Sequence, residues 1–222
     1  QIAPTAREHL IAQALDDGLI KKEQMQALLK WPQLEDAPKL LLLTDLHAMG
    51  GDDAVVDKAI VRDLAKSTDL TVAMFAALLS KNQESIDRTT KYLRRATSTN
   101  RDNALLRTTQ LIRQYNFKSA SPWLVSLLED GSVALTPNQR YWTLYTLLTV
   151  DSVSGLEIWN REVATEPTRI DQVRYLMIVL EAGITPTVEM RERLHIDLSD
   201  HLLGNLFMAG LLNGLKEKAT EE

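Results

Sequence analysis

The sequence contains no cysteine. This absence excludes disulfide bonds, cysteine nucleophiles, cysteine-ligated zinc and iron–sulfur clusters. The rest of the composition is ordinary, with 45% hydrophobic and 25% charged residues in a chain of 222. Such a balance is typical of a globular protein that folds around its own apolar core.

The sequence also lacks an apolar run long enough to cross a membrane. Its most apolar stretch, residues 202–215, is interrupted by three glycines and two asparagines. A spanning helix needs about 20 mainly apolar residues. We therefore predict a buried terminal helix here and no membrane span. Because residue 1 is Gln rather than Met, we also expect a processed or trimmed chain.

Signals of β-structure are nearly absent as well. No alternating run of β-branched and aromatic residues is bounded by an Asn-Gly or Asp-Gly turn, whereas apolar residues recur at helical spacing throughout. We therefore predict an all-α protein. Its helices are expected near residues 5–16, 21–30, 35–49, 52–66, 69–81, 84–97, 102–115, 121–129, 137–149, 154–164, 168–182, 186–196 and 200–216.

The predicted helix starts recur at a nearly constant interval. Ser or Thr before Pro marks a helix start, because the hydroxyl oxygen accepts from a free backbone N–H and Pro has no N–H to lose. Ser121-Pro122, Thr136-Pro137 and Thr185-Pro186 have this form. Thr136 and Thr168 are 32 residues apart, and Ser121 and Ser154 are 33 apart. Two helices in about 32 residues form the unit of a helical repeat.

From residue 102 onward the chain resembles the HEAT-like helical-repeat proteins in this spacing. The resemblance implies antiparallel helix pairs stacked as an α-solenoid, since one such unit cannot bury its inner face alone. The apolar positions that match between units are predicted to be buried. They are Trp142, Leu144, Tyr145, Leu147, Tyr175, Ile178 and Leu180.

Residues 1–50 fit the repeat less well. Their helices are shorter, and Trp31-Pro32, Ala37-Pro38 and Gly50-Gly51 interrupt them. Either an atypical capping unit or a small separate helical subdomain would explain this. We predict a boundary near residue 50, with the helical-repeat array over residues 51–222.

No catalytic motif is present. There is no Gly-x-Ser-x-Gly elbow, no phosphate-binding Walker loop and no Gly-x-Gly-x-x-Gly. The densest group of possible metal ligands is Glu192, His195, Asp197, Asp200 and His201. A di-iron bundle would need a second Glu-x-x-His pair, which is missing. We interpret this group as a polar helix end in which Ser199 or Asp200 caps the next helix, and we expect no cofactor.

Residues 81–118 are basic, with nine Lys or Arg against three Asp or Glu. Their net charge is +6, so the rest of the chain carries −11. A helix advances about 100° per residue, which places Leu93 within about 20° of Ile86. Arg88, Lys91 and Arg95 lie about 140–200° away, on the opposite face. We predict that these three cations face outward. They form either an ordinary solvated face or a surface that docks an acidic protein, the acidic part of a second copy or a nucleic-acid backbone.

These patterns favour a non-enzymatic scaffold that presents a helical-repeat surface to a protein or peptide. One alternative is a helical enzyme or metal-binding protein that uses residues 192–201. A second alternative is nucleic-acid binding through residues 81–118. The overall charge of −5 disfavours nucleic acid, but the local charge of this segment supports it.

Overall fold

The computed structural model describes residues 4–50, 58–131, 133–163 and 168–211, and the description below is confined to them. Helix makes up 75% of the structure, and no strand occurs in these ranges, so the predicted all-α class is confirmed. None of the helices in these ranges combines the length and apolar character that a membrane crossing requires.

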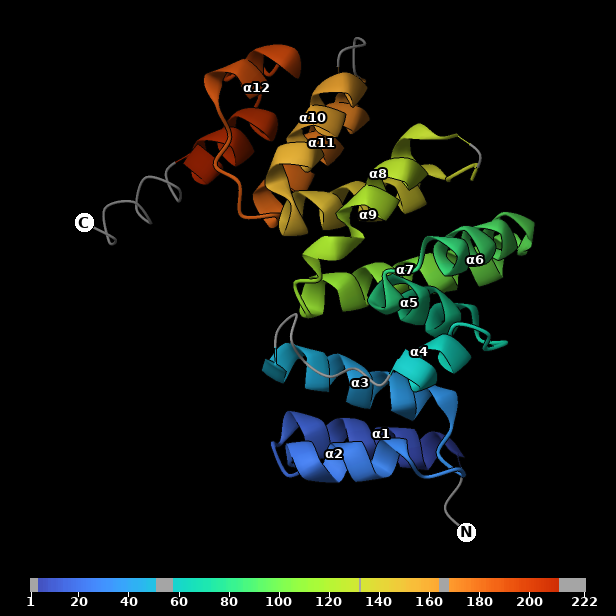
Figure 1. The fold of residues 1–222 in the computed structure, drawn as a ribbon. Helices are drawn as coiled ribbons and strands as arrows, with labels where there is room; N and C mark the ends of the chain where they lie inside the picture. The colour runs from blue at the N-terminus through green and yellow to red at the C-terminus, as the bar shows by residue number, and fades with distance from the viewer. Residues whose placement is uncertain (1–3, 51–57, 132, 164–167, 212–222) are drawn as a thin grey trace. The chain divides into compact units, whose positions relative to one another are not determined.

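The helices follow the predicted ones closely along the chain (Figure 1). They are α1 (Pro4–Asp16), α2 (Lys22–Leu29), α3 (Asp36–Gly50), α4 (Lys58–Leu64), α5 (Leu70–Ser80), α6 (Gln83–Arg95), α7 (Ser98–Gln114), a 3₁₀-helix (Lys118–Ala120), α8 (Ser121–Glu129), α9 (Pro137–Val150), α10 (Ser152–Glu162), α11 (Arg169–Glu181) and α12 (Val188–Arg193). Residues 203–211 are also helical.

Capping accounts for several of these starts. Thr136 precedes α9, where its Oγ1 accepts from Gln139 N at 3.3 Å and Gln139 Oε1 accepts from Thr136 N at 2.8 Å. This reciprocal pair satisfies two backbone donors that a helix start would leave free. Thr168 caps α11 in the same way, through Asp171. Both predicted starts are confirmed.

Two other predicted caps do not form, although α8 begins at Ser121 as predicted. At Thr185-Pro186, Pro186 is buried before the helix and Thr187 caps α12 by accepting from Met190 N. At Ser121-Pro122, Ser121 is itself the first residue of α8, and its hydroxyl donates to Lys118 O at 2.8 Å. The preceding 3₁₀-helix supplies this acceptor, which the pattern of Ser and Pro alone does not reveal.

The chain divides into two compact units, Gln1–Tyr115 and Asn116–Glu222. The predicted boundary near residue 50 stays a prediction, since it adjoins residues 51–57, which lie outside the described ranges.

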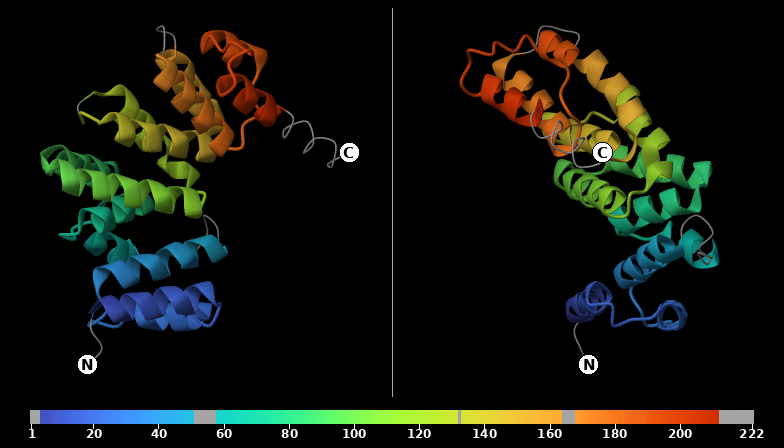
Figure 2. Two further views of the ribbon diagram at one scale, coloured as in Figure 1. Left: turned by 180° about the vertical axis from the view of Figure 1, so that it is seen from behind. Right: turned by 90° about the vertical axis from the view of Figure 1, so that its left-hand side faces the viewer.

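Unit 1 (Gln1–Tyr115) is organised around α5. Odd-numbered helices pack in sequence, α1 on α3, α3 on α5 and α5 on α7, while α2 packs on α3, and α4 and α6 pack on α5. Figure 2 shows α1 and α3 side by side in both views. Every residue from Val72 to Leu78 is buried. A helix that is apolar on all sides must be covered on all sides, and α3, α4, α6 and α7 cover α5.

Unit 2 (Asn116–Glu222) has a similar pattern of neighbours. Helix α9 packs on α8, α10 and α11, and α8 also packs on α10. Gly155 of α10 is buried against α9, where an added Cβ would lie 2.7 Å from Leu148 Cα. Real Cβ atoms do not come that close to a backbone atom, so only glycine allows this contact between α9 and α10.

The predicted core of unit 2 is confirmed at its aliphatic positions. Leu144, Leu147 and Ile178 have exposed fractions of 1%, 0% and 2%. The remaining four predicted residues are only half-buried: Trp142, Tyr145, Tyr175 and Leu180. The tyrosines keep a polar hydroxyl that needs a hydrogen-bond partner, which favours positions at the edge of a core over its centre.

Candidate functional site

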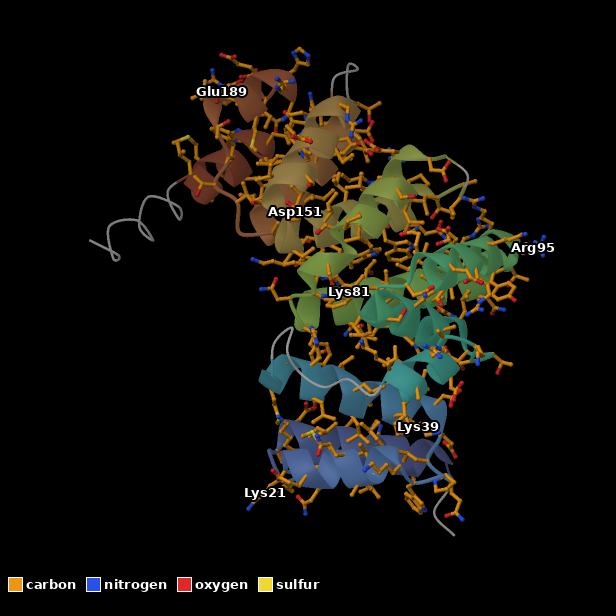
Figure 3. The ribbon with its side chains drawn as sticks, viewed as in Figure 1. Lys21, Lys39, Lys81, Arg95, Asp151 and Glu189 are labelled. Carbon is orange, nitrogen blue, oxygen red and sulfur yellow. The ribbon has the colours of Figure 1, made fainter. Side chains whose placement is uncertain are left out.

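Helix α6 carries the basic residues that the sequence singled out. Asn82 caps it, with Oδ1 accepting from Ser85 N at 2.9 Å. Leu93 and Thr89 are buried on the side that packs on α5, while Lys91 and Arg95 are exposed. Figure 3 shows Arg95 at the C-terminal end of α6 with its side chain extending beyond the ribbon.

Arg88 departs from the predicted outward position. It is half-buried, and its Nη2 donates to Ala65 O at 3.4 Å, a long hydrogen bond. Ala65 follows α4, which packs on α5 beside α6, so the side chain of Arg88 is drawn toward this neighbouring segment. We call Arg88, Lys91 and Arg95 the α6 basic face, with Arg88 at its edge.

A cavity of about 720 Å³ opens between the α4–α5 loop, α6 and α7. We call it the α6–α7 cavity. Its polar lining includes Lys66, Asp69, Tyr92, Asn100, Asn103 and Arg107. This volume is in the range of ligand-binding pockets, which is roughly 300 to 1,000 Å³.

Helical spacing brings these residues to the cavity. Asn100, Asn103 and Arg107 follow one another at intervals of three and four residues along α7, so they share one side of that helix. Tyr92 stands four residues after Arg88 and three before Arg95 on α6. The α6–α7 cavity therefore borders the α6 basic face.

The charges at the cavity favour an anionic ligand. Among the described residues, the side chains of Lys91, Arg95 and Arg107 take part in no hydrogen bond or ion pair. The acid in the lining, Asp69, is already engaged, because its Oδ1 accepts from Thr71 N at 2.8 Å and from Val72 N at 3.1 Å. These bonds direct its charge to the start of α5.

The possible metal ligands near residues 192–201 do not form a site. Within the described ranges, no three His, Asp or Glu side chains come together as a metal site would require. Asp200 Oδ1 instead accepts from Leu202 N at 2.9 Å and Leu203 N at 3.0 Å. The Leu203 hydrogen bond above all holds the pKa of Asp200 below its ordinary value. The interpretation of Asp200 as a helix cap is confirmed.

Unit 2 contains a second, smaller cavity of about 200 Å³ around a buried carboxylate. Glu162 forms an ion pair with Arg140 and accepts from Tyr175 Oη at 2.9 Å. Burial raises the pKa of Tyr175, and the charge of Glu162 raises it further. The ion pair and the hydrogen bond stay within the unit, which indicates that this network stabilises the packing of α9, α10 and α11.

Sequence analysis missed both cavities. Asn100, Asn103 and Arg107 share a helical spacing that could have identified one polar side of α7, but nothing in the sequence shows that α6 and the α4–α5 loop face that same side.

No family model, curated protein or solved structure matches the chain. The candidate site is the α6 basic face together with the α6–α7 cavity.

Proposed function

We propose that this protein is a non-enzymatic interaction scaffold, in which antiparallel helix pairs stack as a HEAT-like α-solenoid. The α6 basic face then docks an acidic surface of a partner protein.

Helix spacing and packing support the solenoid. Helices α1 and α3 begin 32 residues apart, as do α9 and α11, and α8 and α10 begin 31 apart. The two helices of each pair lie in contact with each other. Two further contacting pairs begin 34 residues apart (α3 and α5) and 28 apart (α5 and α7), so the interval is only approximate. Contact between alternate helices is what stacked helix pairs produce.

The observation that carries the docking proposal is the state of Lys91 and Arg95. Both are exposed, and neither has a partner among the described residues, in a chain whose overall charge is −5. Exposed cations of this kind steer an acidic partner and determine how it is oriented.

The two alternative functions have less support. Glu84 and Asp87 are exposed on α6 itself. A nucleic-acid backbone binds through many phosphates in a row, so it would bring phosphates near these carboxylates, whereas an acidic protein surface needs to place carboxylates only near the cations. At residues 192–201, Asp197 and Asp200 are engaged in backbone hydrogen bonds that cap the chain segments after them. An enzyme or metal site would need those carboxylates free.

Charge reversal tests the docking proposal. A partner would be identified by affinity capture from the native source, and its Kd measured with the variant Arg88→Glu, Lys91→Glu, Arg95→Glu. We expect binding to weaken by about tenfold or more, and wild-type affinity to fall as salt rises. The matched control reverses three exposed lysines of unit 1, Lys22, Lys30 and Lys58, and should change affinity far less.

An unchanged Kd in the α6 variant, with its circular dichroism spectrum intact, would place the docking surface elsewhere. Tighter binding to single-stranded oligothymidylate than to any protein would favour the nucleic-acid alternative instead.

A further inference from the structure

We infer that the α6–α7 cavity binds an extended acidic peptide segment of the partner and that Arg107 holds one of its Asp or Glu carboxylates. This inference rests on the proposed function, but it concerns residues outside the α6 basic face. It adds to the general attraction between opposite charges one specific contact, between Arg107 and a carboxylate of the partner.

Arg107 is the cationic group best placed for this role. It lines the cavity, it is exposed, and its guanidinium has no partner among the described residues. A guanidinium presents two parallel N–H donors that match the two oxygens of a carboxylate. Lys66 also lines the cavity, but its Nζ already lies 3.0 Å from Asp63 Oδ1. Arg107 therefore supplies the free cation of the cavity.

Asn100 and Asn103 suit the backbone of an extended peptide. Both are exposed in the cavity wall, and in the part of the chain that the structure describes their side-chain amides make no hydrogen bond. Each amide offers both a donor and an acceptor, as each peptide unit does. Because the two asparagines precede Arg107 on the same side of α7, a bound segment would follow α7 and end its path at the guanidinium.

Tyr92 forms the opposite wall. It is 52% exposed, which is unusual for so large a side chain, and it lies between Arg88 and Arg95 along α6. Tyrosine contributes large contact area at a low cost in conformational entropy and is frequent among residues that dominate binding energy. A segment in the cavity would therefore contact Tyr92 and meet the α6 basic face at the same time.

The charge count favours a peptide over a nucleic acid. The cavity lining carries two cations, Lys66 and Arg107, and one carboxylate, Asp69. A nucleic-acid backbone binds through many phosphate contacts, and a carboxylate in the wall would oppose each nearby phosphate. One carboxylate of a peptide needs only one free cation, which Arg107 provides.

Peptide selection tests the inference directly. The full chain would be used to select binders from a display library of short random peptides, and selected peptides measured by fluorescence anisotropy. We expect the selected pool to be enriched in Asp and Glu relative to the starting library. Arg107→Gln should then raise the Kd of these peptides by about tenfold or more, as expected for the loss of a charged hydrogen bond. Asn103→Asp, which keeps the shape of the side chain and adds a negative charge, should also weaken binding.

Matched controls keep the result interpretable. Lys22→Gln removes one exposed cation of the same unit away from the cavity lining and should leave the Kd unchanged. Because Arg107 and Asn103 are exposed, both variants should keep the wild-type circular dichroism spectrum and Tm.

Each contrary result has a distinct meaning. A selected pool without acidic enrichment overturns the inference, as do peptides that bind Arg107→Gln as tightly as wild type. If those peptides still lose affinity in the triple variant of the α6 basic face, the docking proposal survives and only the cavity is wrong. If oligothymidylate displaces the peptides more effectively than excess peptide does, the ligand is a nucleic acid and the inference fails.

Discussion

Three arginines of unit 2 bond to carboxylates on other helices or segments, whereas several cations of unit 1 bond to nothing in the described ranges. The pairs of unit 2 are Arg140 with Glu162, Arg161 with Glu129, and Arg169 with Asp200. Two of these pairs span 32 and 31 residues, close to the 32 residues between the starts of α9 and α11. Lys91, Arg95 and Arg107 are among the cations of unit 1 that have no partner within the described residues.

Local composition explains the difference. Residues 116–222 contain nine Lys or Arg and fifteen Asp or Glu, so carboxylates outnumber the cations that could pair with them. Residues 58–115 contain eleven Lys or Arg and five Asp or Glu, so some cations have no carboxylate to pair with. The same residue type thus stabilises packing in one unit and stays available for a partner in the other.

The comparison predicts that the two units differ at their surfaces and not in their cores. Leu43 in unit 1 and Leu147 in unit 2 both have an exposed fraction of 0%. Changing either leucine to Ala should therefore lower the free energy of unfolding by about 2 to 5 kcal/mol, because a buried isopropyl group is lost and a cavity remains. Urea denaturation followed by circular dichroism would measure both.

Leu106, which is largely exposed on α7, provides the control for this pair. Leu106→Ala should change stability by about 0.5 kcal/mol or less. A loss that small at Leu43 or Leu147 would mean that the core of that unit is wrongly described.

Neutralising one charged residue in each unit tests whether the paired charge of unit 2 contributes more to stability than the unpaired charge of unit 1. Glu162 has a side-chain exposed fraction of 8%, against 40% for its partner Arg140. Glu162→Gln should cost about 1 to 3 kcal/mol, less than a fully buried pair, because Arg140 can still reach water. Arg107→Gln should change stability by about 0.5 kcal/mol or less, since no described contact is lost.

Glu157→Gln is the matched control on α10, because Glu157 is exposed and unpaired among the described residues. Its Tm in thermal denaturation should differ from that of wild type as little as the Tm of Arg107→Gln does. Equal losses from Glu162→Gln and Arg107→Gln would remove the distinction between structural and available charges.

The smallest expected effect is a pH dependence in unit 2. Burial above all, together with the hydrogen bond from its Oη to Glu181 Oε2 at 2.9 Å, raises the pKa of Tyr141 from 10.0 to about 12. A raised pKa means that the folded state holds the proton more tightly, so this contribution is complete below pH 10 and is lost between pH 10 and about 12.

Tyr141→Phe should therefore lower stability by less than about 1 kcal/mol at pH 8, because the pair is solvent-exposed. The difference in Tm between wild type and variant should shrink as pH rises through this window. A difference that stays constant from pH 8 to 12 would show that the hydroxyl contributes nothing through its proton.

The helices and the apolar faces within them could be predicted from the sequence because the interactions that form them are local. Thr136 and Thr168 cap helices through residues three positions away, and apolar residues at helical spacing identify Leu144, Leu147 and Ile178 as core. The interaction of a residue with others three or four positions along the chain depends on little else.

Only part of the candidate site could be predicted from the sequence. The excess of cations in residues 81–118 and the exposure of Lys91 and Arg95 follow from composition and helical angle. Arg88 could not be placed in this way, because its position depends on Ala65, which is 23 residues away in the sequence.

Local sequence patterns predicted which segments are helical, where several of them begin and where positive charge collects. Only the packing of helices shows that Tyr92 and Arg107 line one cavity, that the buried carboxylate of Glu162 pairs with Arg140, and that Gly155 allows α9 and α10 to touch. The physical reason is distance along the chain. A cap or an amphipathic face involves neighbours within one or two turns, whereas a cavity or a buried ion pair depends on which helices pack together.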